Sequence, residues 1–70
     1  MNTAGIKSVI AKHGETQGDL AEAIGLTPSA LSLRVNGKVR FSLNEVNRIR
    51  KRYKLSPEET VEIFFDEAVS

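Results

Sequence analysis

The chain has 70 residues, no cysteine and one histidine, and its ten basic and nine acidic side chains give a formal net charge of +1. This length predicts one domain, 1–70, with a small core; the composition excludes disulfides and thiolate metal sites, and His13 alone cannot form a metal cluster. No apolar run approaches the roughly 20 residues of a membrane span, and the N-terminus lacks a signal-peptide pattern. We therefore expect a soluble, cytoplasmic protein with no metal site.

Five helices are predicted from local start and stop signals. A hydroxyl residue followed three positions later by an acid is typical of a capping box, and this pattern occurs at Thr16–Asp19, Ser42–Glu45 and Ser56–Glu59. Thr27-Pro28 gives another start, because proline suits the first helical position. Glycines at 14, 25 and 37 are typical of helix ends. The predicted helices span 3–13, 17–24, 28–36, 43–54 and 57–68.

Apolar residues recur within these segments at a period near 3.6, as in amphipathic helices that share one core. The predicted core residues are Ile6, Val9, Ile10, Leu20, Ala21, Ala23, Ile24, Leu26, Leu31, Leu43, Val46, Ile49, Tyr53, Val61, Phe64, Phe65 and Ala68. No alternation typical of strands is sustained. The predicted fold class is therefore all-α, a compact five-helix bundle.

Basic side chains are concentrated in the middle of the chain. Residues 34–55 carry eight bases and one acid, whereas residues 56–70 carry five acids and no base. Such a concentration favours a surface that binds a polyanion. The alternative is that these bases pair with acids on neighbouring helices.

Residues 16–38, TQGDLAEAIGLTPSALSLRVNGK, form the most specific pattern in the chain. They resemble the helix-turn-helix of the phage Cro and repressor (XRE-type, lambda repressor-like) family, with Leu20-Ala21, Ile24-Gly25-Leu26, Leu31 and Asn36-Gly37 as the matching features. The flanking helices fit that family's five-helix layout more loosely. The resemblance implies a helix-turn-helix at about 17–36, in which a second helix enters the major groove of DNA.

By this resemblance, one face of the 28–36 helix reads base edges. The implied base-reading residues are Thr27, Pro28, Ser29, Ser32, Leu33 and Asn36. Serine hydroxyls can donate or accept, and Leu33 and Pro28 can pack against thymine methyl groups. No Arg, Gln or Asn lies in the first two turns, so thymine methyls and DNA shape are expected to contribute to specificity. The alternative for Leu33 is burial against another helix.

Backbone phosphates are the second set of contacts that the resemblance implies. The candidate residues are Gln17, Arg34, Lys38, Arg40, Ser42 and Asn44. Arg34 occupies a position that we equate with a large apolar residue of the family, so it either turns outward to a phosphate or pairs with an acid. Gly18 either allows a phosphate to approach the backbone or has no special role. The bases of the 43–54 helix either contact phosphates or form a solvated or paired surface.

The C-terminal helix suggests a protein partner, because its apolar set is wider than one core stripe requires. Val61, Phe64, Phe65 and Ala68 are the candidate homodimer interface. Adjacent helical residues point about 100° apart, so one phenylalanine can enter the core while the other stays available. The alternative is that both are buried.

These observations favour a sequence-specific regulator of transcription that binds a double-stranded DNA operator as a homodimer and occludes a promoter, as a phage or prophage repressor or Cro-like protein does. We expect neither a cofactor nor a small-molecule substrate. The alternative is an anti-repressor-like modulator that uses the same fold to bind a second regulator protein. An enzyme is not expected, because His13 lies at a helix end and no catalytic triad, metal-ligand set or phosphate loop accompanies it.

Overall fold

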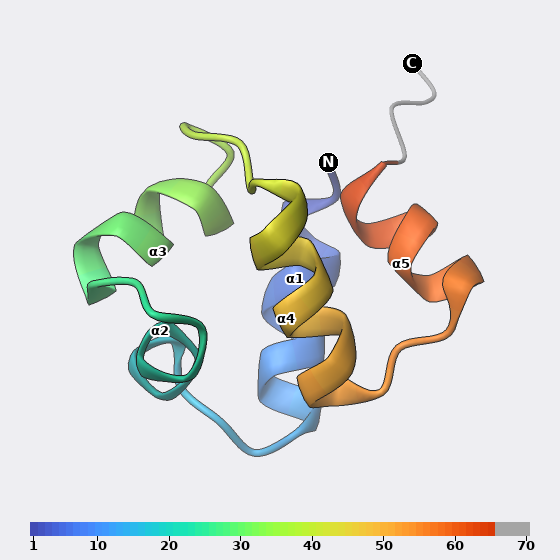
Figure 1. Ribbon diagram of the computed structural model, residues 1–70, viewed down its shortest axis with the longest axis horizontal. Coiled ribbons are helices and arrows are strands. Elements are labelled where there is room, and N and C mark those ends of the chain that lie inside the picture. The colour runs from blue at the N-terminus through green and yellow to red at the C-terminus, as the bar shows by residue number, and fades with distance from the viewer. Residues whose placement is uncertain (66–70) are drawn as a thin grey trace.

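Five α-helices make up most of residues 1–65, the part of the chain that the computed structural model describes (Figure 1). They are α1 (Thr3–Lys12), α2 (Gln17–Ile24), α3 (Pro28–Val35), α4 (Leu43–Tyr53) and α5 (Pro57–Phe64). Residues 1–65 contain no strand. The predicted all-α class and the number of helices are thus confirmed for these residues. None of the five helices has both the length and the apolar character that crossing a membrane would require.

Side-chain caps fix the start of every helix. The three predicted capping boxes are present, at Thr16–Asp19, Ser42–Glu45 and Ser56–Glu59. In each, the hydroxyl accepts from the backbone N–H three residues on, at 3.0–3.1 Å, while the carboxylate accepts from the N–H of the cap residue. Thr27 caps α3 in the same way, accepting from the N–H of Ala30 at 3.1 Å. These bonds satisfy donors that the first turn of a helix leaves unpaired.

The helix ends differ more from the prediction. The α1, α3 and α4 helices each end one residue earlier than expected, and α5 ends at Phe64, well before residue 68. Residues 66–68 of that prediction lie outside the described residues. Gly25 closes α2 with a φ of 80°, a left-handed conformation that glycine adopts without steric cost. Lys54 closes α4 with a φ of 54°, although it is not a glycine.

One hydrophobic core joins all five helices. Its buried members are Ile6, Ile10, Leu20, Ala21, Ile24, Leu31, Val35, Val46, Ile49, Tyr53, Leu55, Ile63 and Phe64. Val9, Leu26 and Phe41 are partly buried against them. Four predicted core residues are instead exposed: Ala23, Leu43, Val61 and Phe65. The prediction was wrong there because these side chains lie on the solvent side of their helices.

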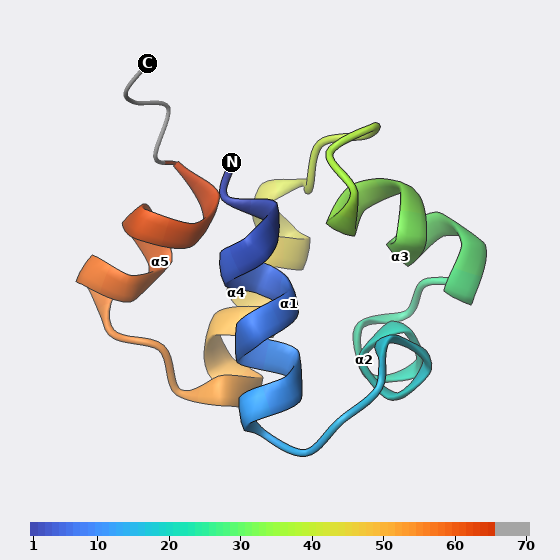
Figure 2. The ribbon, with the colours of Figure 1, turned by 180° about the vertical axis from the view of Figure 1, so that it is seen from behind.

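The arrangement of the helices separates the two ends of the molecule. Figure 1 shows α1 and α4 in the middle, α2 and α3 on one side and α5 on the other. The view from behind gives the same order, with α1 in front of α4 (Figure 2). Contacts between α2 and α3, and of α5 with α1 and α4, agree with this layout. The α3 and α5 helices therefore lie on opposite sides of the molecule.

A polar cluster connects the α1–α2 loop to the end of α4. The Glu15 carboxylate accepts from two nitrogens of Arg52, with the Nε contact at 3.0 Å, and from the Tyr53 hydroxyl at 2.7 Å. The His13 ring stacks on Tyr53 with a centroid separation of 4.5 Å. Hydrogen bonds from Arg52 and then from Tyr53 lower the pKa of Glu15 from 4.5 to about 2. The carboxylate is therefore held in its charged form as part of the fold.

Candidate nucleic-acid interface

The unit formed by α2, residues 25–27 and α3 is built from buried apolar residues and a defined turn. Leu20, Ala21 and Ile24 of α2 are buried together with Leu31 of α3. The N–H of Leu26 donates to the Ala21 carbonyl at 2.9 Å, which closes the end of α2 around Gly25. The two helices are therefore held as one unit, with the outer side of α3 available to solvent.

The outer face of α3 carries the residues predicted to read bases. Thr27, Pro28, Ser29, Leu33 and Asn36 are exposed, and Ser32 is half-buried. Leu33 has an exposed fraction of 48%, so its alternative role as a core residue is excluded. The hydroxyl of Thr27 already caps the helix. The predicted set thus occurs on one surface, although its polar atoms are partly engaged within α3.

Asn36, the C-cap of α3, folds its side chain back onto the helix. Its amide nitrogen donates to the Ser32 carbonyl at 2.9 Å and approaches the Ser32 hydroxyl oxygen at 3.3 Å. The backbone N–H of Asn36 donates to the same carbonyl at 3.0 Å. The amide nitrogen therefore faces the last turn of α3.

Arg34 does not turn outward. Its Nε donates to Glu45 at 2.9 Å, and its Nη1 donates to the Ala30 carbonyl at 3.0 Å. The side chains of Arg34 and Glu45 are only 20% and 12% exposed. The expected phosphate role of Arg34 is therefore not supported, because the guanidinium joins α3 to the capping box of α4. The neighbouring Val35, and not position 34, provides the buried apolar side chain.

Two other arginines of the basic segment also bond within the molecule. Arg48 donates to the carbonyl of Ile24 at 3.0 Å, at the C-terminal end of α2. Arg52 donates to Glu15. These contacts agree with the alternative that part of the basic segment is a paired surface.

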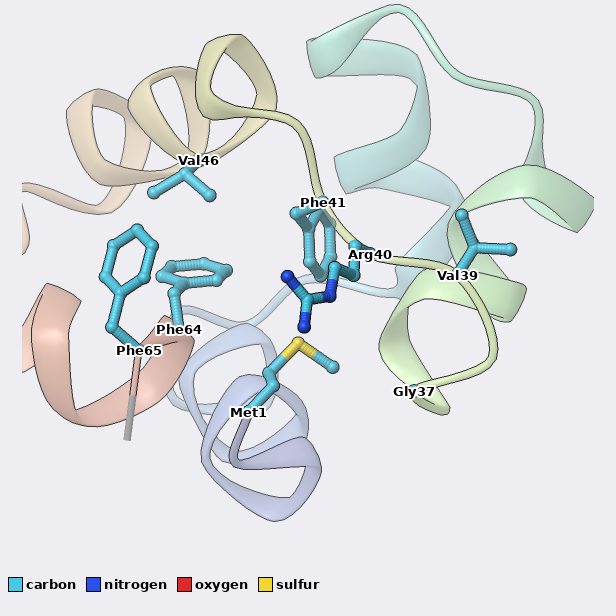
Figure 3. Close-up of a pocket in the computed structure, with 8 residues that line it drawn as sticks. All are labelled: Met1, Gly37, Val39, Arg40, Phe41, Val46, Phe64 and Phe65. Carbon is cyan, nitrogen blue, oxygen red and sulfur yellow. The ribbon is translucent and has the colours of Figure 1, made fainter. Parts of the chain in front are cut away.

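The α3–α4 loop contains two further basic candidates, Lys38 and Arg40, which are both exposed. A pocket of about 330 Å³ lies beside this loop, lined by Met1, Gly37, Val39, Arg40, Phe41, Val46, Phe64 and Phe65. Figure 3 shows the guanidinium of Arg40 pointing into this pocket. A phosphate contact would therefore require Arg40 to rotate out of it.

The N-termini of α2 and α4 carry the remaining phosphate candidates. Gln17 is the first residue of α2 and is half-buried, while Asn44 is the second residue of α4 and is exposed. The first helical hydrogen bonds are donated by Leu20 and Val46. The N–H groups of Asp19 and Glu45 donate to the hydroxyls of their cap residues. The N–H groups left without an intrahelical acceptor are therefore those at positions 17 and 18 of α2 and 43 and 44 of α4. Ser42 is exposed, but its hydroxyl and N–H both belong to the capping box.

The α5 residues predicted to form an interface divide into two groups. Phe64 is 8% exposed and packs edge-on against Phe41 with a centroid separation of 5.4 Å, so it belongs to the core and its predicted place in a dimer interface is not supported. Val61 and Phe65 are 55% and 49% exposed. Ala68 lies outside the described residues. The adjacent phenylalanines therefore do point in different directions, one into the core and one toward solvent.

A comparison with protein families gives a match over residues 5–67 of the chain. Neither the curated proteins nor the solved structures gave a match. Because the matched region includes all of α2, α3, α4 and α5 and nearly all of α1, the chain belongs to the family described as "Protein of unknown function (DUF739)".

Proposed function

We propose that this protein is a sequence-specific regulator of transcription that binds double-stranded DNA through a helix-turn-helix of the Cro and repressor (XRE) type. The observation that carries the proposal is the outer face of α3, where Ser29, Ser32, Leu33 and Asn36 reach solvent while α2 supports the inner face. Alpha-helices supported in this way place side chains in the major groove. Occlusion of a promoter, as by a phage or prophage repressor, would then need no cofactor.

Positively charged and N–H groups border this face and would contact phosphates. Lys38 and Arg40 follow α3 directly and are exposed. The starts of α2 and α4 offer backbone N–H groups beside Gln17 and Asn44, and such groups bind anions. Contacts of this kind fix the register of a protein on DNA without reading its sequence.

A homodimer completes the proposal. Val61 and Phe65 lie four residues apart on the exposed side of α5 and its end, which is the spacing of neighbours on one helix face. Because α5 lies away from α3 (Figure 1), pairing through α5 would leave both α3 helices free. A two-fold dimer would then read two half-sites about 34 Å apart.

Fluorescence anisotropy tests the proposal with a labelled random-sequence duplex titrated at several salt concentrations. We expect micromolar binding that weakens steeply with salt, because the protein displaces counterions from phosphates. Lys38→Ala should weaken binding to all sequences alike and reduce the salt slope by about one unit.

Lys12→Ala is the matched control for that variant. It removes the same charge from the last turn of α1, where Lys12 is exposed. Its effect on the salt slope should be smaller than that of Lys38→Ala. Absence of binding even at low salt would reject the proposal.

The exposed apolar residues of α5 also favour a second candidate function, an anti-repressor-like modulator that binds another regulator. In that case Val61 and Phe65 would contact the partner protein. Three arginines of the basic segment are already bonded internally, which reduces the charge available for DNA. Absence of duplex binding together with tight binding to a partner regulator would favour this candidate.

A further inference from the structure

The contact between Ser32 and Asn36 determines which hydrogen-bonding groups the outer face of α3 offers. A backbone carbonyl can only accept, so the amide group at 2.9 Å from the Ser32 carbonyl must be the nitrogen of Asn36. The same nitrogen lies 3.3 Å from the Ser32 hydroxyl oxygen. Asn36 therefore directs its donor group into its own helix, and its carbonyl Oδ1 remains as an acceptor.

The Ser32 hydroxyl takes the complementary role. Its oxygen accepts from Asn36, and its own hydrogen is left for another acceptor. Because positions 32 and 36 are neighbours on one helix face, one donor and one acceptor are presented side by side. The amide nitrogen of Asn36 carries two hydrogens, and the Ser32 carbonyl and hydroxyl are the two acceptors that it contacts. The usual two-bond contact of asparagine with a base would therefore require Asn36 to leave Ser32.

Adenine is the base that matches this pair. In the major groove adenine presents an amino donor at N6 beside an acceptor at N7, whereas guanine presents two acceptors. The Oδ1 of Asn36 would accept from N6, and the Ser32 hydroxyl would donate to N7. Guanine would set its O6 against Oδ1, an unfavourable contact between two acceptors.

Leu33 extends the match to the paired base. It lies next to Ser32 in the chain and is 48% exposed. It is not one of the apolar side chains that pack against the core within residues 1–65. The thymine opposite adenine carries a methyl group in the major groove, and leucine can pack against it. Cytosine, which also has an amino donor, has no such methyl group.

We infer that Ser32, Leu33 and Asn36 together recognise an A·T base pair in the major groove, with the acceptor and donor on adenine and the apolar side chain on thymine. This inference rests on the proposed function, because it names the base pair that α3 would read. It assigns the donor to Ser32 and the acceptor to Asn36.

Base analogues in a selected binding site test each contact separately. Replacing the adenine by 7-deazaadenine removes N7, replacing it by purine removes the amino group, and replacing thymine by uracil removes the methyl group. We expect one A·T position of the site to lose about tenfold in affinity with each analogue, within the range for single base contacts.

Each loss of affinity should disappear in the protein variant that lacks the corresponding side chain. Ser32→Ala should become insensitive to 7-deazaadenine, Asn36→Ala to purine, and Leu33→Ala to uracil. Ser8→Ala, which removes an exposed hydroxyl of α1, should keep all three sensitivities. Circular dichroism shows whether each variant is folded. If a variant does not fold, the analogues still test the three contacts with the wild-type protein.

The outcomes separate this inference from the proposed function. Salt-dependent duplex binding with a selected site that has no such A·T position, or with analogue losses that the variants leave unchanged, would overturn the inference alone. Absence of duplex binding at low salt would overturn both.

Discussion

Arg34, Arg48 and Arg52 each donate hydrogen bonds within the molecule, and their partners come from three different segments. Arg34 bonds to Glu45, Arg48 to the carbonyl of Ile24 and Arg52 to Glu15. A count of charges along residues 34–55 therefore overstates the positive surface available to an anion. Lys38 and Arg40, in the loop after α3, are the exposed bases closest in sequence to the outer face of α3.

The Glu15 cluster predicts how stability depends on pH. The pKa of Glu15 is lowered from 4.5 to about 2 in the folded state, so the charged carboxylate stabilises the fold above the unfolded pKa. That contribution should be lost as the pH falls from about 4.5 toward 2. Urea unfolding across this range should show a smaller loss of stability in Glu15→Gln than in the wild type. Glu22→Gln removes an exposed carboxylate of α2 and should keep the wild-type dependence of stability on pH. The same dependence in the wild type and both variants would contradict the role of Glu15.

Replacing Gly18, in the first turn of α2, by alanine should stabilise the protein. A Cβ at this position would meet only the Thr16 hydroxyl oxygen, at an ordinary 3.7 Å. Gly18→Ala should therefore raise the free energy of unfolding by about 0.5–1 kcal/mol, because alanine favours the helix. Gly25→Ala should lower it, because position 25 has a φ of +80°. Thermal unfolding measures both, and a loss of stability in Gly18→Ala would show that the glycine is needed in the fold.

At the scale of the elements, the helix starts could be predicted from the sequence because their causes are local. Capping boxes and the Thr27-Pro28 start involve residues within one turn, and all of them are present. The start of α1 carries a weaker signal: Asn2 accepts from Gly5 at 2.9 Å, but no acid follows at the third helical position. The end of α5 at Phe64 has no glycine or proline beside it to indicate a stop.

Which side of a helix is buried was harder to predict, because a period of 3.6 does not show how wide the buried stripe is. Leu43 fits the apolar repeat of α4, yet it lies at the exposed start of the helix, with 71% of its surface accessible. Val35 and Leu55 are buried although the repeat did not include them. The bonds of Glu15 to Arg52 and Tyr53 join residues almost forty positions apart, so spacing along the chain gave no signal for them.

The two phenylalanines at the end of α5 should behave differently on substitution. Phe65→Ala removes a half-exposed ring, so it should weaken self-association with little effect on the free energy of unfolding. Phe64→Ala removes a buried ring that contacts Phe41, so it should cost about 3–5 kcal/mol and unfold much of the protein. Sedimentation equilibrium and urea unfolding measure the two effects. A wild-type protein that stays monomeric at high concentration, or a Phe65→Ala dimer of unchanged strength, would reject the proposed interface.

At the scale of the whole molecule, α3 and α5 lie on opposite sides (Figures 1 and 2). The two sides meet at the pocket that Arg40 and Phe65 both line. The α5 helix carries Glu58, Glu59 and Glu62 and has no base, so its surface would repel DNA. The α3 face and its following loop carry no acid. We therefore expect nucleic acid to bind on the α3 side and a protein partner on the α5 side.

Amide chemical shifts of the ¹⁵N-labelled protein, followed by NMR during titration with a DNA duplex at low salt, test this assignment most directly. We expect the largest shifts in α3, in the loop that contains Lys38 and Arg40, and at the starts of α2 and α4, while α5 changes little. Shifts centred on α5, or no shifts at any duplex concentration, would contradict it.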